Sequence, residues 1–181
     1  MRIVARAVGI LLMVTLTFLG GAPVAGATPH QAQAARVAST RHIVALGAFE
    51  AEVLFSTLVT RDVGNSKCEF VVQGQLTFRG TLDGVAEGTT TALIDAPCAE
   101  ATNPANIGAF RDVFRFEGTF SGSVDGVAAT GDLTYAGVTR PGGSIDANIR
   151  LRADGAKATL HTVTAQLGTG GTYRGAVVLK G

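Results

Sequence analysis

Nine residues of this chain occur twice in nearly the same form, as FRGTLDGVA at 78–86 and as FSGSVDGVA at 120–128. In each copy, apolar residues alternate with polar ones at the two-residue period of a β-strand, and an Asp-Gly pair follows. Asp-Gly is a preferred sequence for the two-residue type I′ turn, in which both central residues have positive φ. The repeat therefore predicts two tight β-hairpins, which turn at Asp83-Gly84 and at Asp125-Gly126.

A glycine interrupts the apolar face of each repeated strand. Gly80 and Gly122 each lie two residues after a phenylalanine, Phe78 and Phe120 respectively. Glycine inside a strand typically marks a bend, a bulge or the close approach of another backbone. Because bends on the inner face help a strongly coiled sheet to close on itself, the repeat favours a barrel.

Most of the remaining chain shows the same alternation. In residues 156–167 its phase slips near Thr162, which indicates a bulge. About eight strands are expected, and the connections between them are mostly short. We therefore predict an all-β domain, an eight-stranded antiparallel up-and-down barrel, with a two-sheet β-sandwich as the alternative. Besides the first repeat, strands are expected at 49–59, 68–72, 113–124, 127–135, 144–152, 156–167 and 172–180.

The strand predicted at 49–59 has a competitor. Its alternation puts Phe49, Phe55 and Val59 on one face, as a half-buried strand would. Residues 45–58 would also form a passable amphipathic helix. Of the two, we favour the strand.

The first residues have the pattern of an export signal. Arg2 and Arg6 form a positive segment, and the uncharged apolar run 8–20 follows it. The small residues at 25–27 suit a signal peptidase, with a second cleavage site at 32–34, and the run is short for a membrane span of about 20 residues. We predict a cleaved signal peptide at 1–27, a flexible leader at 28–40, one domain at 41–181, and secretion without a stable membrane anchor.

Cys68 and Cys98 are the only cysteines. In an exported chain, an even pair is most simply a disulfide. We expect this bond to tie the longest connection, residues 95–107, to the start of the strand at Cys68.

The charge balance argues against a nucleic-acid partner. The chain has 15 basic and 14 acidic residues, and without Arg2 and Arg6 the basic residues number 15 − 2 = 13, one fewer than the acidic ones. No run of basic residues occurs in the sequence. Because nucleic acids and anionic membranes attract clusters of Lys and Arg, we expect neither as a partner.

Motifs for metal or cofactor chemistry are missing from the sequence. His42 and His161 each lack a second histidine at ligand spacing, and no HExxH, EF-hand or GxSxG pattern occurs. The segment GTGG at 168–171 is a poor phosphate loop, because neither a helix nor Lys-Ser/Thr is expected after it. We predict no metal and no cofactor, and we favour a protein without enzymatic activity.

Candidate ligand-binding residues are the large side chains that the alternation directs inward, where small neighbours would leave room for a cavity. Tyr135 and Tyr173 would orient a ligand through their hydroxyls, unless they are core tyrosines that reach a barrel end. A turn at Asp83-Gly84 would also direct Glu87 inward, either at the mouth or in a polar cavity, because an unpaired buried carboxylate is costly. The residues assigned to the cavity are Phe78, Phe114, Phe116, Phe120, Leu133, Tyr135, Tyr173 and Glu87.

Two segments carry a resemblance to a known group. The glycine- and phenylalanine-rich strands of 116–135 and the late segment GTGGTYRG at 168–175 resemble the calycin-like small β-barrels of the allene oxide cyclase and dirigent group, and secreted proteins of actinobacterial type. The resemblance covers roughly the last 110 residues. It implies a barrel that binds or guides a hydrophobic small molecule, often as an oligomer, but no catalytic residue of that group maps onto this chain.

Three functions remain open at this point. The first is a secreted, non-enzymatic barrel that binds an apolar or amphipathic small molecule in an internal pocket. The second is an allene oxide cyclase-like isomerase or cyclase, with Glu87 as the first candidate for acid–base chemistry. The third is a surface or partner-binding module, which predicts an exposed apolar patch or an unpaired edge strand in place of a cavity.

Overall fold

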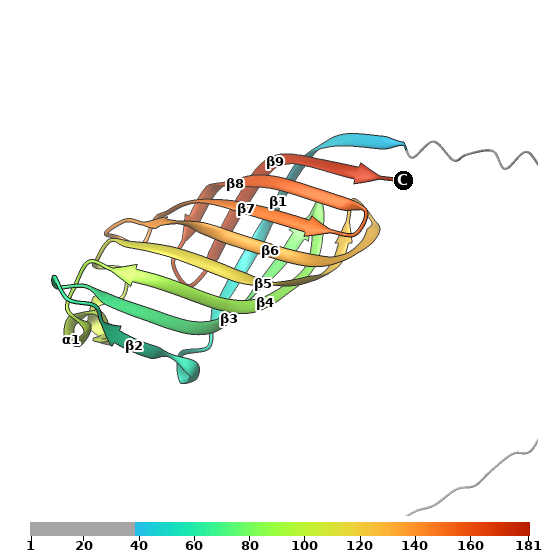
Figure 1. Ribbon diagram of the computed structural model, residues 1–181. Coiled ribbons are helices and arrows are strands. Elements are labelled where there is room, and N and C mark those ends of the chain that lie inside the picture. The colour runs from blue at the N-terminus through green and yellow to red at the C-terminus, as the bar shows by residue number, and fades with distance from the viewer. Residues whose placement is uncertain (1–38) are drawn as a thin grey trace, which may run out of the picture. The chain divides into compact units, whose positions relative to one another are not determined.

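Strand β1 (Thr40–Val53) is paired along both of its edges, and this double pairing closes the sheet into a barrel (Figure 1). Its residues 40–49 pair with β9 (Gly170–Lys180), and its residues 47–53 pair with β3 (Cys68–Gly80). The computed structural model describes residues 39–181. The predicted signal peptide at 1–27 and nearly all of the predicted leader lie outside the described residues.

The strands between β3 and β9 follow one another around the barrel in chain order, and every neighbouring pair is antiparallel. A ninth strand, β2, pairs only with the first residues of β3. The predicted eight-stranded antiparallel barrel is thus confirmed, and the β-sandwich alternative is wrong. The remaining elements are η1 (Phe55–Thr57), β2 (Val59–Asp62), β4 (Leu82–Ile94), α1 (Cys98–Ala101), η2 (Pro104–Asn106), β5 (Asp112–Val124), β6 (Val127–Thr139), β7 (Ile145–Ala153) and β8 (Ala156–Gln166).

The strand predicted at 49–59 exists, but the short helix η1 interrupts it. After Val53 the chain leaves the sheet for five residues, and it rejoins β3 as β2. The interruption turns the Phe55 side chain outward, where it is 60% exposed. Its predicted place beside the buried Phe49 is therefore wrong, as is the helix alternative for 45–58.

The second copy of the repeat forms the predicted hairpin. Val124, the last residue of β5, is paired with Val127, the first residue of β6. Asp125 and Gly126 between them have φ of 51° and 77°. The positive φ at both central residues is that of a type I′ turn, so this prediction is confirmed.

The first copy turns three residues earlier than predicted. Gly80, with φ of 113°, ends β3, and β4 begins at Leu82, so that Asp83-Gly84 lies inside a strand. Two long-range hydrogen bonds select this turn: Thr81 N–H donates to Leu46 O (3.0 Å), and Leu82 N–H donates to the Tyr173 hydroxyl (3.0 Å). The local Asp-Gly preference is overridden, and the prediction of a turn at Asp83-Gly84 is wrong.

The inner face of the barrel carries the core. The large side chains that alternate inward along β5 and β9 are buried, among them Phe120 and Val177. The predicted slip near Thr162 is a register shift between Thr162 and Thr164 of β8. Because the shift is absorbed there, Tyr173 and Leu160 both remain on the inner face.

One end of the barrel, called the loop end here, is crossed by residues 95–111, which connect β4 to β5. Gly142 N–H, in the β6–β7 turn, donates to Gly108 O (2.9 Å), so the connection is bonded to the neighbouring hairpin. Asp95, at the start of the connection, accepts hydrogen bonds from Lys67 (2.7 Å) and Arg111 (3.1 Å). These two bonds, that from Lys67 first, hold the pKa of Asp95 below its ordinary value.

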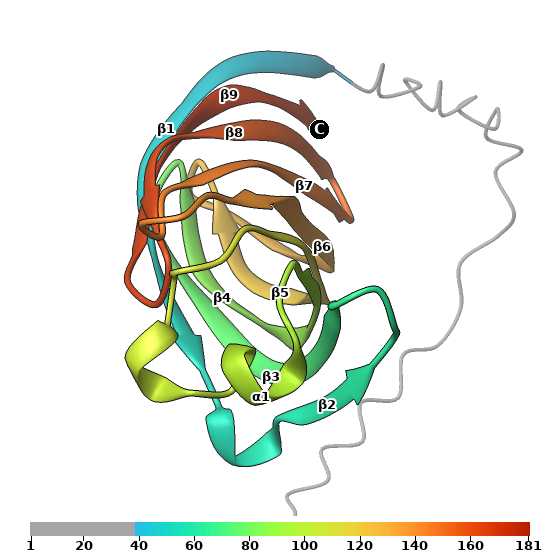
Figure 2. The same cartoon turned by 90° about the vertical axis from the view of Figure 1, so that its left-hand side faces the viewer.

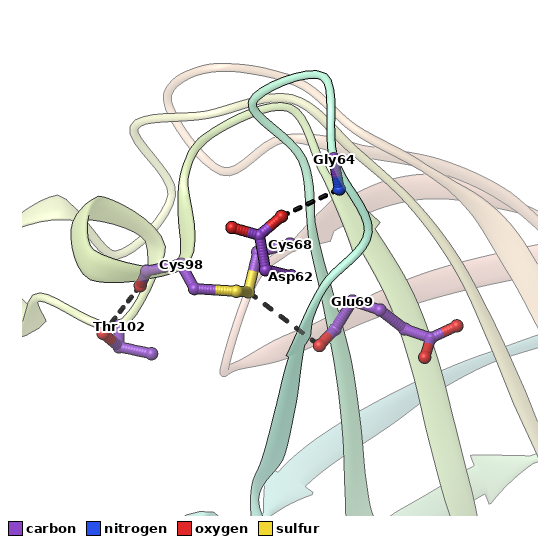
Figure 3. The surroundings of a disulfide bond; sticks show 6 residues. All are labelled: Asp62, Gly64, Cys68, Glu69, Cys98 and Thr102. Atoms are coloured by element: carbon purple, nitrogen blue, oxygen red, sulfur yellow. Dashed lines mark hydrogen bonds between the residues drawn. A yellow bond between two sulfur atoms is a disulfide. The ribbon is translucent and has the colours of Figure 1, made fainter.

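A disulfide fixes the same connection to the barrel. Cys68, the first residue of β3, is bonded to Cys98 at the start of α1, with Cα atoms 4.9 Å apart (Figure 3). Both the pairing and its position are as predicted. The loop end is therefore held by a covalent bond as well as by the charged contacts of Asp95.

We expect removal of the disulfide to lower the free energy of unfolding by about 3–4 kcal/mol, because the bond closes a loop of 30 residues in the unfolded chain. The measurement is urea unfolding with and without dithiothreitol. The matched control is the double variant Cys68→Ser/Cys98→Ser, whose unfolding midpoint should no longer respond to dithiothreitol. A wild-type midpoint that is insensitive to complete reduction would contradict the prediction.

Candidate functional site

Seven of the eight predicted cavity residues lie inside the barrel. Their exposed fractions run from 0% for Phe120 to 8% for Phe114. They come from β3, β5, β6 and β9, so strands far apart in the sequence bring them together. The seven are Phe78, Phe114, Phe116, Phe120, Leu133, Tyr135 and Tyr173.

The aromatic rings among them are packed against one another. The Tyr135 ring lies edge-on to Phe114, with centroids 5.0 Å apart, and to Phe49 at 5.4 Å. Phe78 meets Phe120 at 6.1 Å and Tyr173 at 6.0 Å. Side chains therefore fill the barrel at this level, where the predicted pocket would lie. Phe49 belongs to this cluster, and its place in an alternating strand was the signal that could have assigned it.

Two hollows lie at the surface instead. One, of about 420 Å³, opens on the outer side of β1, β3 and β4, beside Glu52 and Glu87. The other, of about 280 Å³, lies at the loop end between residues 107–109, 142–143 and 166–167. Neither is lined by any of the seven inward candidates.

Glu87 lies on the outer face, which corrects its predicted position. Because the first hairpin turns at Gly80, Leu82 and Ala86 of β4 face the core. Glu87 directly follows Ala86, so its side chain points to the opposite face of the strand and is exposed. It pairs in register with Gln75 of β3 and lines the larger surface hollow. Glu87 is therefore no candidate for acid–base chemistry inside the barrel.

Tyr173 performs a structural task. Its hydroxyl accepts a hydrogen bond from Leu82 N–H (3.0 Å) and lies within donating distance of Leu82 O (3.3 Å) and Arg79 O (3.4 Å). It lies directly over Gly47, where an added Cβ would fall within 2.3 Å of the hydroxyl oxygen. The side chain thus ties β9 to the β3–β4 turn across β1, as expected of a core tyrosine that reaches a barrel end.

Tyr135 differs, because its hydroxyl has no hydrogen-bond partner although the residue is only 4% exposed. Burial raises the pKa of this hydroxyl, which therefore stays protonated. A buried hydroxyl without a partner costs stability, and such groups commonly contact an ordered water or a ligand. Tyr135 is the one predicted cavity residue whose polar atom is unsatisfied in the described part of the chain.

A second unsatisfied atom lies nearer the loop end. Asp112 Oδ1, at the start of β5, is buried without a hydrogen-bond partner. Burial, opposed by hydrogen bonds from Thr139, raises the pKa of this carboxyl group. The inward Phe114 follows Asp112 on its strand, so the carboxyl group lies at the rim of the aromatic cluster.

Part of β1 and all of β2 have one strand edge that no other described strand pairs with. Residues 50–53 of β1 and all of β2 pair with β3 on one side only, and we call these two segments the free edge. All four residues of β2 are exposed on both faces of the strand, and Figure 2 shows β2 at the border of the sheet. Apolar side chains surround the free edge: Leu54, Phe55, Val59 and Val63 are 42%, 60%, 64% and 41% exposed.

Comparisons with known proteins add no family: no family model matches this sequence, and no curated protein matches it. The likeness to allene oxide cyclase and dirigent barrels stays a prediction. Within residues 39–181, no three His, Cys, Asp or Glu side chains come close enough to hold a metal ion. No helix in this range has the length and hydropathy needed to cross a membrane.

The two tyrosines make a matched pair for mutation. Tyr173→Phe leaves the buried Leu82 N–H without an acceptor, and we expect it to lower the free energy of unfolding by about 1–3 kcal/mol. Tyr135→Phe removes a hydroxyl that has no partner, and it should leave stability unchanged or raise it. Urea unfolding of both variants checks the prediction, and equal losses in the two would refute it.

Asp112→Asn should raise stability at neutral pH. The pKa of Asp112 is raised in the folded state. Above that pKa, the buried charged carboxylate lowers the free energy of unfolding of wild type. As the pH falls through that pKa, the carboxylate is protonated and wild type regains this stability. The advantage of the variant should therefore shrink between neutral pH and about pH 4. Urea unfolding at both pH values tests this, with the exposed Asp83→Asn as the control, and a gain that grows on acidification would contradict it.

Proposed function

We propose that this protein is an exported, non-enzymatic binding module that recognises an extended polypeptide segment along the free edge. The observation that supports this is the free edge itself: backbone with one unpaired side, next to exposed apolar side chains. Such an edge can accept an additional strand, whose main chain supplies affinity and whose alternate side chains supply specificity. The third of the functions left open by the sequence is thus the one that the geometry favours.

The charges on β2 support this proposal. Natural edge strands are commonly protected by charged side chains that oppose pairing with another chain. The two charged residues of β2 are both occupied within its own hairpin. Arg61 forms an ion pair with Glu69 (2.7 Å), and Asp62 accepts a hydrogen bond from Gly64 N–H (2.8 Å). On β2 itself, both charged side chains are thus engaged, and the exposed carboxylates of the free edge are Glu50 and Glu52 of β1.

The packed interior also supports an external site. A pocket for an apolar ligand usually presents a concave, largely preformed surface. Here the aromatic rings pack edge-on against one another in the interior, and both surface hollows lie elsewhere. Binding inside the barrel would require these rings to move apart.

A small apolar molecule with one hydrogen-bonding group is the second candidate partner. The specific observation in its favour is the unpartnered hydroxyl of Tyr135, to which such a group would bind. Native mass spectrometry of the protein from culture medium, with Tyr135→Phe beside wild type, tests this. A co-purifying molecule that the variant fails to retain would support it, and identical spectra free of any adduct would remove it.

Val59→Lys is the test of the polypeptide-binding proposal. The probe is an array of short peptides with alternating apolar and polar residues, beside the same peptides with proline at their centres. We expect wild type to bind the former and not the latter, because proline lacks the N–H that a strand must donate. Val59→Lys should weaken binding about tenfold, or about 1.4 kcal/mol.

The control is Val163→Lys, which introduces the same charge at a similarly exposed valine of β8, 57% against 64%. It should bind as wild type does. Equal binding of the proline peptides, or equal loss in both variants, would overturn the proposal. Circular dichroism on all variants ensures that a loss of binding is not a loss of folding.

A further inference from the structure

The barrel gathers basic side chains that the sequence keeps apart. Arg150 and Arg152 lie on β7, Lys157 on β8 and Arg174 on β9, and all four are exposed on the outer face. None forms an ion pair with another described residue, whereas six other cations do. The absence of a basic run in the sequence therefore does not mean the absence of a basic surface.

The register places like charges directly opposite each other. Arg152 is paired with Lys157 across β7 and β8. Like charges in opposed positions destabilise a sheet, and their repulsion is relieved when an anion lies over them. Asp132 on β6 is the register partner of Arg152, and Asp154 lies in the β7–β8 turn, but neither carboxylate forms an ion pair with the four cations.

Apolar side chains continue the same surface. Val44 and Leu46 of β1 are 73% and 59% exposed. Val44 is paired with Ala176 of β9, and Leu46 is paired with Arg174 of β9. The two apolar side chains therefore lie next to the basic group on the same outer face. We call the surface made by Arg150, Arg152, Lys157, Arg174, Val44, Leu46 and Ala176 the cationic face.

We propose that the cationic face binds the surface of an anionic lipid bilayer. Clustered Lys and Arg are attracted to anionic headgroups, and exposed aliphatic side chains beside them enter the boundary between headgroups and acyl chains. A soluble anionic polysaccharide fits less well. Sugar rings pack on exposed aromatic rings, and the aromatic residues of β1, β7, β8 and β9, Phe49 and Tyr173, are both buried.

A second copy of this chain also fits less well on this face. Two copies meeting through the same surface would bring Arg174 and Lys157 of one against the same cations of the other. Charge complementarity therefore favours a negatively charged surface. This site is independent of the free edge, because different residues form it and because a bilayer, not a polypeptide, occupies it.

The experiment is co-sedimentation of the full chain, purified from culture medium, with vesicles. One set contains phosphatidylglycerol and phosphatidylcholine, and the other contains phosphatidylcholine alone. We expect binding to the anionic vesicles only, and we expect it to disappear at about 1 M salt, where the Debye length is about 3 Å. Because every variant carries the same N-terminal residues, differences between variants report on the cationic face.

Arg152→Gln/Lys157→Gln should lower the partition coefficient roughly thirtyfold, from about a fivefold contribution of each cation near an anionic surface. The control is Arg115→Gln, at an exposed arginine of β5 on the other side of the barrel, and it should bind as wild type does. Val44→Ser/Leu46→Ser should weaken binding severalfold, while Val127→Ser, at a valine 52% exposed in another part of the barrel, should not.

Three results would overturn the proposal. The first is failure of wild type to bind anionic vesicles, and the second is equal binding to both kinds of vesicle. The third is binding to heparin, used as a soluble polyanion, as strong as to vesicles and unaffected by Val44→Ser/Leu46→Ser, which would assign the face to a soluble polymer. A salt-dependent dimer in light scattering that the glutamine variant abolishes, without vesicle binding, would assign it instead to self-association.

Discussion

The double pairing of β1 is the constraint on which the rest of the barrel depends. Where β1 meets both β9 and β3, Gly47 leaves space for the Tyr173 hydroxyl, which reaches from β9 to Leu82 at the start of β4. Thr81 is bonded to β1 at the same point. Three segments distant in sequence are thus joined at one place, and this joint sets the register. A slip of one residue would turn Phe49 out of the core and reverse both faces of β1.

The same geometry explains why an edge remains unpaired. β9 begins at Gly170, so its pairing with β1 ends at Phe49, although β1 continues to Val53 along β3. From this point only one neighbour is present, and after η1 the strand continues as β2 with the same neighbour. The closure of the barrel at residues 40–49 and the unpaired edge at residues 50–53 and β2 therefore have one cause. β1 and β2 together are longer than β9, the strand that would pair with them.

Local patterns in the sequence predicted most of the fold, and the errors arise where distant residues decide. Asp125-Gly126 turns as its own chemistry dictates, because nothing else competes for it. Asp83-Gly84 does not form a turn, because the hydroxyl of Tyr173, remote in sequence, accepts a hydrogen bond from Leu82 N–H and so fixes the turn before Leu82. This earlier turn places Glu87 on the outer face. The alternation around Arg150 and Arg152 was readable as an outward row, but their meeting with Arg174 depends on strand order, which one sequence does not contain.

The distribution of charge over the barrel makes the two proposed sites compatible. β4 and β8 are separated by three strands in either direction around the barrel, so they lie on opposite sides. Glu87 of β4 and Glu52 of β1 line the outer hollow beside β3, whereas Lys157 of β8 lies within the cationic face. A negative surface attracts one side and repels the other, which orients the molecule as it approaches. Bound in this way, the protein would direct β4 away from the bilayer. The free edge begins at residue 50 of β1, beyond the last residue paired with β9, and it continues into β2, so a polypeptide would reach it at the loop end of the barrel.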